Sequence, residues 1–109
     1  MIKLQAIGNL GQDATTNQVN GQSVINFSVA HTEKWKDSSG TQRERTTWIS
    51  CSYWTTSNVA QYLKKGTSVF VEGIPEVKLY TPNGGSPQAN LSLRVSTLQL
   101  LGGKREDGD

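Results

Sequence analysis

KWKDSSGTQRERTTWISCSYW, residues 34–54, holds all three tryptophans of the 109-residue chain and four of its eleven basic residues. Its last seven residues alternate in character, as the residues of a half-buried strand do. Trp48 and Trp54 fall on one face, with two serines between them. The other face is apolar and consists of Ile49, Cys51 and Tyr53. The pattern predicts a strand with one face in the core and two tryptophan rings on the solvent side.

Basic side chains lie close to these rings in the sequence: Lys34, Lys36, Arg43 and Arg45. Aromatic rings on a polar face beside positive charges indicate a surface that stacks on something flat and negatively charged. Single-stranded nucleic acid fits, because its unpaired bases stack on aromatic side chains and its backbone is anionic.

A tryptophan in a small domain can instead belong to the core. The polar neighbours of Trp48 and Trp54 argue against this alternative. For Trp35, the alternation of side chains along its strand predicts the inward face, which it would share with the charged Glu33. Either the strand continues past the core at that point, or a bulge shifts its register.

The charge of the chain is unevenly distributed. The formal net charge is +2, but three of the nine acidic side chains lie in the last four residues. Residues 1–105 therefore carry eleven basic and six acidic side chains, a net charge of +5. An excess of this kind favours a polyanionic partner.

Several classes of protein are disfavoured by what the sequence lacks. One cysteine, Cys51, and one histidine, His31, provide neither an internal disulfide nor a zinc site, so we expect no metal and no cofactor. The acidic residues are too scattered for metal-dependent nuclease chemistry, so we expect no enzyme. No apolar run reaches the ~20 residues that span a bilayer, and residues 1–4 lack a signal-peptide pattern, which predicts a cytoplasmic protein.

Apolar alternation and turn residues predict five main strands, over residues 2–8, 24–35, 42–53, 68–73 and 91–101. Residues 15–19 could add a short strand before the hairpin signal Asn20-Gly21. Residues 8–11 break the first strand. A short helix capped by Ser57 or Asn58 is expected to end at Gly66. Residues 75–87 form a long connection whose centre, residues 80–85, resembles the tip of a hairpin arm.

The fold class that follows is all-β: a five-stranded Greek-key barrel of the OB type, with one short helix between its third and fourth strands. A plain sandwich is the competing fold, but it would not normally place its only helix at that point. We expect residues 1–103 to form this domain and residues 104–109 to be a short, disordered acidic tail.

Short motifs along almost the whole chain resemble the bacterial single-stranded DNA-binding protein family. Each motif is weak alone, but together they occur in the order and at the spacing of that family. They are IGNLGQD (residues 7–13), INFSVA (25–30), EKWKD (33–37), TW (47–48), YLKKG (62–66), VFVEG (69–73) and LQLLGG (98–103).

The resemblance implies a non-enzymatic, largely sequence-independent binder of single-stranded DNA that acts in replication, recombination and repair at the nucleoid. It also implies a homo-oligomer, most simply a homotetramer, and the open edge of the first strand could pair with a second copy. The base-stacking positions of the family fall on Trp35, Trp48, Trp54 and Tyr80. Our candidates for neutralising phosphates are Lys3, Lys34, Lys36, Arg43, Arg45, Lys78 and Arg94.

The sequence departs from the family at two places. Many members end in a long tail with an acidic tip and a final apolar residue, which recruits other proteins. This sequence ends in a short acidic stretch without the apolar residue, so the resemblance gives little support for tail-mediated partners. The segment Ile49-Ser50-Cys51 also stands where the family often has a histidine and an arginine near the subunit contact.

Other functions of the same fold stay open. One is a replication-restart accessory or RNA-binding OB protein. A different class is an oligosaccharide-binding OB module, which also uses exposed aromatic side chains. Sugar binding needs no cluster of basic residues and would be insensitive to salt, so salt dependence distinguishes these classes.

Overall fold

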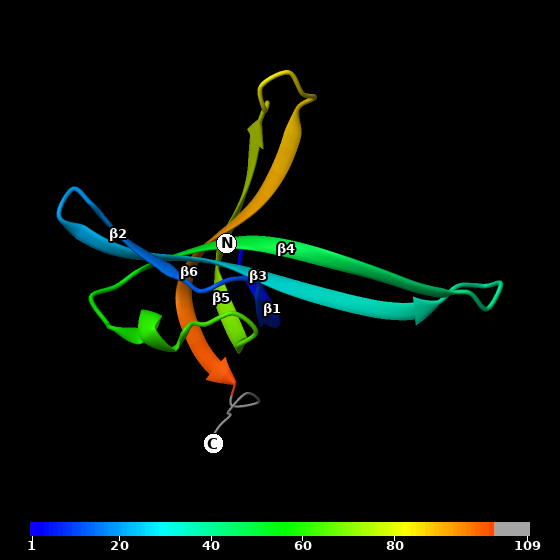
Figure 1. Ribbon diagram of the computed structural model, residues 1–109, viewed down its shortest axis with the longest axis horizontal. Helices are drawn as coiled ribbons and strands as arrows, with labels where there is room; N and C mark the ends of the chain where they lie inside the picture. Colours follow the sequence, from blue (N-terminus) through cyan, green and yellow to red (C-terminus); the bar gives the residue numbers. More distant parts are fainter. Residues whose placement is uncertain (102–109) are drawn as a thin grey trace.

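A computed structural model describes residues 1–101 of the chain (Figure 1). The elements, in chain order, are β1 (Leu4–Leu10), β2 (Thr15–Val19), β3 (Gln22–Lys36), β4 (Gln42–Trp54), the 3-10 helix η1 (Val59–Tyr62), β5 (Ser68–Tyr80) and β6 (Gln88–Leu101). Nearly all of the regular secondary structure is therefore β-strand, as the alternating pattern predicts. The acidic tail predicted at residues 104–109 lies outside the described residues.

Five of the strands close into a barrel. The sheet order is β1-β5-β6-β4-β3-β2, and β1 also pairs with β3. Each of β1, β5, β6, β4 and β3 therefore has a neighbour on both sides, and β2 is added outside the ring on β3. Only the β4–β6 pairing is parallel. This is the topology of an OB fold, so the predicted fold class is confirmed, with β2 as an additional strand.

The inward-facing residues of these strands form one apolar core. The buried set is Leu10, Ile25, Phe27, Val29, Ile49, Cys51, Leu63, Val69, Val71, Leu93 and Val95. In β3, β4 and β5 these are the residues that the alternation assigns to the inside. Burial raises the pKa of the Cys51 thiol to about 12, so this cysteine is an inert core residue.

Gly8 allows β1 to close the ring against β3. A Cβ at this position would lie against the carbonyl of Ala30 and 2.7 Å from a methyl carbon of Val29. The strand consequently runs on through Asn9 and Leu10, which pair with Ala30 and Val29. The predicted break at residues 8–11 is therefore wrong for the first three of these residues, because here glycine permits a close crossing.

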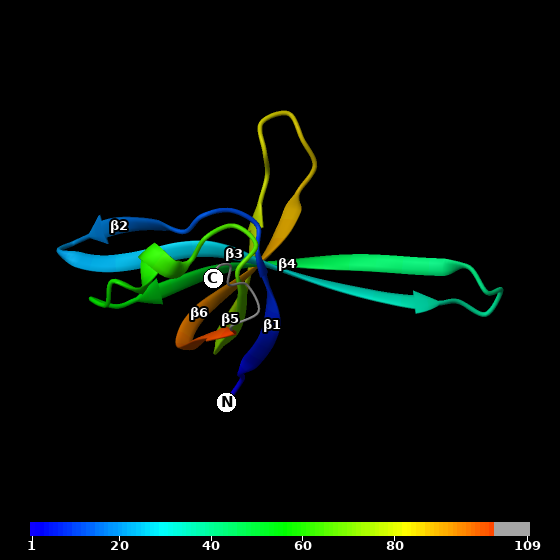
Figure 2. The same cartoon turned by 60° about the horizontal axis from the view of Figure 1, so that its bottom comes forward.

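Two long hairpins extend from the barrel as arms (Figures 1 and 2). The Cα radius of gyration is 15.9 Å, compared with about 13 Å for a compact domain of this length. One arm is the outer part of β3 and β4, which pair as far as Lys36 and Gln42. The other is the outer part of β5 and β6, which pair as far as Tyr80 and Gln88.

The second arm corrects the prediction of a long connection over residues 75–87. β5 continues to Tyr80, and the turn is confined to the residues between β5 and β6. Pro75 is tolerated because β5 pairs with β1 only up to Gly73, so beyond that point one edge of β5 is open. A register shift at Glu72 and Gly73 marks the place where β5 leaves the barrel.

The predicted helix is a single 3-10 turn and ends earlier than expected, at Tyr62. The Ser57 hydroxyl, and not the Asn58 side chain, accepts a hydrogen bond from the Val59 N–H at 3.2 Å. Leu63, which follows the turn, is fully buried and covers one end of the barrel. Within residues 1–101, no helix is long and apolar enough to span a bilayer.

Candidate nucleic-acid interface

Three of the four candidate rings lie on one face of the sheet. Residues paired across neighbouring strands point to the same side, and Trp48 and Trp54 point away from the core with the serines of β4. The parallel pairing aligns Ser50 of β4 with Ser92 of β6, so Ser92 lies on this face as well. The pairing of β6 with β5 then places Lys78 and Tyr80 of β5 on the same face. We call this side the ring face.

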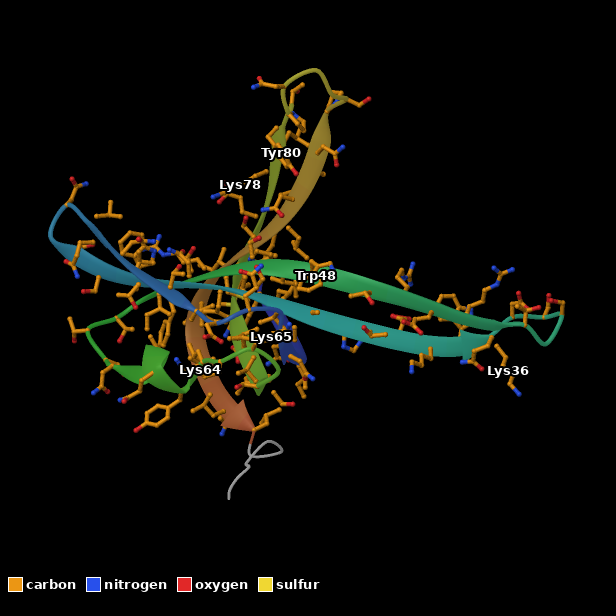
Figure 3. All side chains as sticks on the ribbon, viewed as in Figure 1. Lys36, Trp48, Lys64, Lys65, Lys78 and Tyr80 are labelled. Atoms are coloured by element: carbon orange, nitrogen blue, oxygen red, sulfur yellow. The ribbon has the colours of Figure 1, made fainter. Side chains whose placement is uncertain are left out.

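All three rings of the ring face are open to solvent. The exposed fractions are 55% for Trp48, 39% for Trp54 and 53% for Tyr80. In Figure 3, Trp48 lies near the base of the arms and Tyr80 lies farther out on the β5–β6 arm. The prediction that Trp48 and Trp54 are exposed and not part of the core is confirmed.

Gly11 fixes the place of the Trp48 ring. A Cβ on Gly11 would lie 2.6 Å from Cζ3 and 2.8 Å from Cη2 of that ring. One side of the indole therefore rests against the chain after β1, and the absence of a side chain there makes room for it. Support from one side favours a ring that keeps its other face available for stacking.

Trp35 lies on the opposite side of the β3–β4 arm. The pairing of β3 with β4 runs without a break from Val24–Trp54 to Lys36–Gln42, so no bulge shifts the register. Trp35 and Glu33 therefore stay on the side of β3 that faces the core farther back in the strand. At their positions the strand has already passed the end of the core, and 42% of Trp35 is exposed. Of the two alternatives for this residue, continuation past the core is correct.

Trp35 has basic neighbours of its own on that opposite side. The guanidinium carbon of Arg45 lies 5.7 Å from the centre of the Trp35 ring, and an Arg45 nitrogen lies 3.7 Å from a Glu33 oxygen. Arg43 is the cross-strand partner of Trp35. The four aromatic candidates thus lie on two separate surfaces, which the assignment of all four rings to base stacking did not distinguish.

Six of the seven basic candidates divide between the same two surfaces, with Arg43 and Arg45 on the side of Trp35. Lys34, Lys36, Lys78 and Arg94 share the ring face, and Lys78 and Arg94 line one polar groove with Trp54. Among the described residues, none of these four makes an ion pair within 4.0 Å, although Glu76 lines the same groove. Lys3 lies elsewhere on the barrel, 2.9 Å from Glu72. Two further exposed lysines, Lys64 and Lys65, follow the 3-10 turn (Figure 3), and the Lys65 N–H donates to Oδ1 of Asp13 at 2.8 Å.

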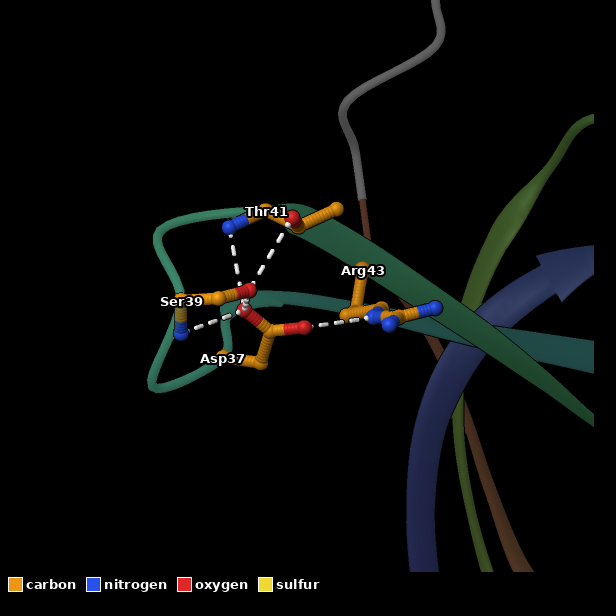
Figure 4. Close-up of polar contacts among 4 residues, drawn as sticks. All are labelled: Asp37, Ser39, Thr41 and Arg43. Carbon is orange, nitrogen blue, oxygen red and sulfur yellow. Dashed lines mark hydrogen bonds and ion pairs between the residues drawn. The ribbon is translucent and has the colours of Figure 1, made fainter.

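Asp37 organises the tip of the β3–β4 arm (Figure 4). Its Oδ1 accepts hydrogen bonds from the Ser39 N–H at 3.0 Å, the Ser39 hydroxyl at 2.7 Å and the Thr41 N–H at 3.0 Å. Its Oδ2 accepts from Nε of Arg43 at 2.8 Å. The spacing of Asp37 to Ser39 is the local signal in the sequence that predicts this kind of turn.

These contacts make the turn sensitive to acid. The Ser39 hydroxyl, then Arg43 and Thr41, lower the pKa of Asp37 from 3.8 to about 2. A lowered pKa in the folded state stabilises the turn above about pH 4, and this stabilisation is lost as the pH falls toward 2. We expect an NMR titration of the Asp37 carboxyl carbon to have its midpoint near 2, with the Ser39 and Thr41 amide shifts following it.

The matched variant for this titration is Asp37→Asn. It keeps an acceptor oxygen but cannot titrate, so the acid-dependent amide shifts of Ser39 and Thr41 should disappear. A wild-type midpoint near 4 would show that the carboxylate does not hold the turn in solution.

Residues 1–101 match the model of the Single-strand binding protein family. The chain belongs to this family. Single-stranded DNA-binding protein 1 of Chlorobaculum tepidum is 36% identical, and the match covers 97% of this chain and 68% of that protein. The Single-stranded DNA-binding protein of Neisseria meningitidis serogroup A is also 36% identical, over 96% of this chain and 62% of that protein. The chain therefore spans about two thirds of the length of these family members, which are named as binding proteins and not as enzymes.

Solved structures of family members have the same fold. A Plasmodium falciparum SSB in complex with ssDNA superposes with a TM-score of 0.77 at 24% identity, covering 93% of this chain and 95% of that one. The small single-stranded DNA-binding protein of Streptomyces coelicolor gives 0.75 at 16% identity, covering 92% and 94%. At these identities the similarity supports the OB fold and does not by itself assign residues.

Proposed function

We propose that this chain binds single-stranded DNA without catalysis, largely independently of sequence, and protects it during replication, recombination and repair. The observation that carries the proposal is the ring face, where Trp48, Trp54 and Tyr80 are exposed on the same side as four basic residues that make no ion pair within residues 1–101. Bases stack on the rings whatever their identity, and the basic side chains neutralise phosphates. The family membership of the chain supports the same proposal.

Trp35, Arg43 and Arg45 have a secondary role in this proposal. They lie on the far side of the β3–β4 arm, so a strand must pass around the arm to reach them after leaving the ring face. Lys3 contributes least, because it lies on the barrel beside Glu72. We place the protein in the cytoplasm, at the nucleoid, which is consistent with a single cysteine that is buried and unpaired.

The direct test is a titration of tryptophan fluorescence with oligo-dT. We expect strong quenching by the single strand and much weaker binding to a duplex of the same length, because stacking needs unpaired bases. Salt should weaken the binding of oligo-dT. Equal affinity for duplex at moderate salt would contradict the proposal, and binding that is insensitive to salt would point to an uncharged ligand such as an oligosaccharide.

We also propose that the protein is a homo-oligomer, a tetramer by its resemblance to the family, and that β1 forms one of its contacts. β1 pairs with β3 only at Asn9 and Leu10, so the edge before them is open on that side. The carbonyl of Ile7 points to this open edge and accepts a hydrogen bond from Nδ1 of His31 at 3.1 Å. Because residues two apart in a strand point to the same side, the N–H and C=O of Gln5 also lie on the open edge.

An apolar groove lies along this edge. Its volume is about 450 Å³, and its lining residues come from both arms as well as from β1: Leu4, Gln5, Ala6, Ile7, His31, Thr47, Ile49, Phe70 and Leu91. Val77, the cross-strand partner of Leu91, continues the apolar surface along the β5–β6 arm and is 66% exposed. An unpaired strand edge beside an apolar surface is suited to pairing with a second copy.

Gln5→Pro tests this contact. It removes the Gln5 N–H on the open edge and leaves the β1–β5 hydrogen bonds in place, because those belong to the alternate residues. We expect the variant to sediment as a smaller species than the wild type at micromolar concentration. Gln5→Ala, which keeps the N–H, is the matched control and should sediment like the wild type. A monomeric wild type, or a Gln5→Pro variant of unchanged size, would contradict the proposed contact.

A further inference from the structure

Between the Trp48 and Trp54 rings, the ring face is made of short, uncharged hydrogen-bonding side chains. The register aligns them in rows across three strands. In one row Ser28 of β3, Ser50 of β4 and Ser92 of β6 are neighbours. In the next row Asn26 of β3 and Ser52 of β4 are neighbours. Together with Asn90 at the edge of the first row, these six half-buried residues form what we call the amide shelf.

The two amides of the shelf have unused hydrogen-bonding capacity. The Asn90 amide nitrogen lies 3.4 Å from the Ser50 hydroxyl and 3.3 Å from the Ser92 hydroxyl, and its oxygen lies 3.5 Å from the Ser50 hydroxyl. All three distances exceed the usual range of ~2.7–3.2 Å, so these bonds are weak. The Asn26 oxygen accepts from the Ser52 hydroxyl at 3.1 Å, and the described structure gives its two N–H donors no partner.

The position of the shelf decides which part of a nucleotide it meets. The basic residues of the ring face lie around the shelf: Lys34 and Lys36 along one arm, and Lys78 and Arg94 on β5 and β6. Phosphates are attracted to these positive side chains. The shelf lies between the two tryptophan rings, and Gln12 and Asp13 line the same pocket. At its edge, Ser52 and Asn90 have Arg94 and Lys78 as cross-strand neighbours. A base that stacks beside the shelf turns a polar edge toward the amides. Amides and hydroxyls can donate to and accept from base edges.

We propose that the amide shelf hydrogen-bonds the edges of bases that stack on the ring face, and that Asn26 and Asn90 make the affinity depend on base composition. This inference rests on the proposed stacking function and adds a composition-dependent term to it. An asparagine amide both donates and accepts, so it can bond all four bases, but with a strength that depends on the donors and acceptors each base presents. The shelf therefore tunes affinity without reading a defined sequence.

The test converts an amide into an acceptor and compares two pyrimidines. Asn90→Asp presents only acceptor oxygens, which suit the N4 amino group of cytosine and oppose the O4 carbonyl of thymine. The measurement is the affinity for oligo-dC relative to oligo-dT of equal length, at mildly alkaline pH where cytosine is uncharged. We expect the dC:dT affinity ratio to rise roughly fivefold or more over that of the wild type. Using a ratio cancels the general weakening caused by the added negative charge.

Asn26→Asp is a second, independent variant, and it decides the question by the same criterion if Asn90→Asp does not fold. Gln99→Glu is the matched control, because it makes the same amide-to-acid change at the other end of β6, where Gln99 pairs with Phe70. An unchanged or lower dC:dT ratio in the aspartate variants would overturn the inference. Failure of the wild type to bind either oligonucleotide would instead overturn the proposed function, so the two failures are distinguishable.

Discussion

Replacing both Trp48 and Trp54 with alanine is expected to weaken binding of oligo-dT by roughly thirtyfold to ten-thousandfold. Each stacked base contributes about 1–3 kcal/mol, and each 1.4 kcal/mol corresponds to about a factor of ten in affinity. The two rings lie on the same side of one strand, separated by five residues. At about 3.4 Å per residue they are roughly 20 Å apart, so they contact different nucleotides and their contributions should nearly add. Anisotropy of a labelled oligonucleotide measures this loss without relying on the rings that are removed.

The same double variant should remain folded. The exposed fractions of 55% for Trp48 and 39% for Trp54 mean that the rings contribute little to the core. We expect Tm to change by only a few degrees, as for most surface substitutions. Tyr62→Ala is the control, because it removes a ring that is 57% exposed on the 3-10 turn and not on the ring face, and it should keep wild-type affinity. A large loss of Tm in the double variant would place a ring in the core, and unchanged affinity would show that DNA does not stack there.

How much of this site the sequence could predict depends on the range of the interactions involved. The exposure of Trp48 and Trp54 is predictable because it follows from alternation within seven residues. The core positions of β3, β4 and β5 are predictable for the same reason. Each of these inferences needs only the period of a strand and the polarity of adjacent residues.

The two separate surfaces could not be predicted in this way. Parity alone gives Trp35 the inward face, but only the pairing with β4 shows that the strand continues beyond the core. The tip of the β5–β6 arm was predicted at residues 80–85, but the strands below it were not: residues 76–80 alternate like a strand, but Pro75 obscures the pattern, and the β6 partners occur after the turn. Ion pairs such as Lys3 with Glu72 join residues that are distant in the sequence. The sequence therefore predicts which residues are candidates better than it predicts which of them act together.

Salt dependence should reflect this division of the basic residues. If Lys34, Lys36, Lys78 and Arg94 each neutralise one phosphate, counterion release gives a slope of about −0.7 per contact, or roughly −3 in total for one barrel on a short oligo-dT. Affinity would then fall several-hundredfold for a tenfold increase in salt. Two carboxylates should reduce the slope somewhat: Glu44, the cross-strand neighbour of Lys34, and Glu76, which lines the groove with Lys78. The stacking contribution depends little on salt, so binding should persist in the high-salt limit.

Two matched double variants separate the surfaces. Lys34→Ala/Lys36→Ala removes two charges from the ring face and should reduce the slope by about 1.4, while most of the salt-resistant affinity remains. Arg43→Ala/Arg45→Ala removes two charges from the same arm, but from the opposite side, where both arginines already contact carboxylates. Because a short strand on the ring face does not reach that side, we expect this variant to keep nearly the wild-type slope. If the arginine variant lowers the slope as much as the lysine variant does, the strand contacts both sides of the arm, and the ring face is not its main path.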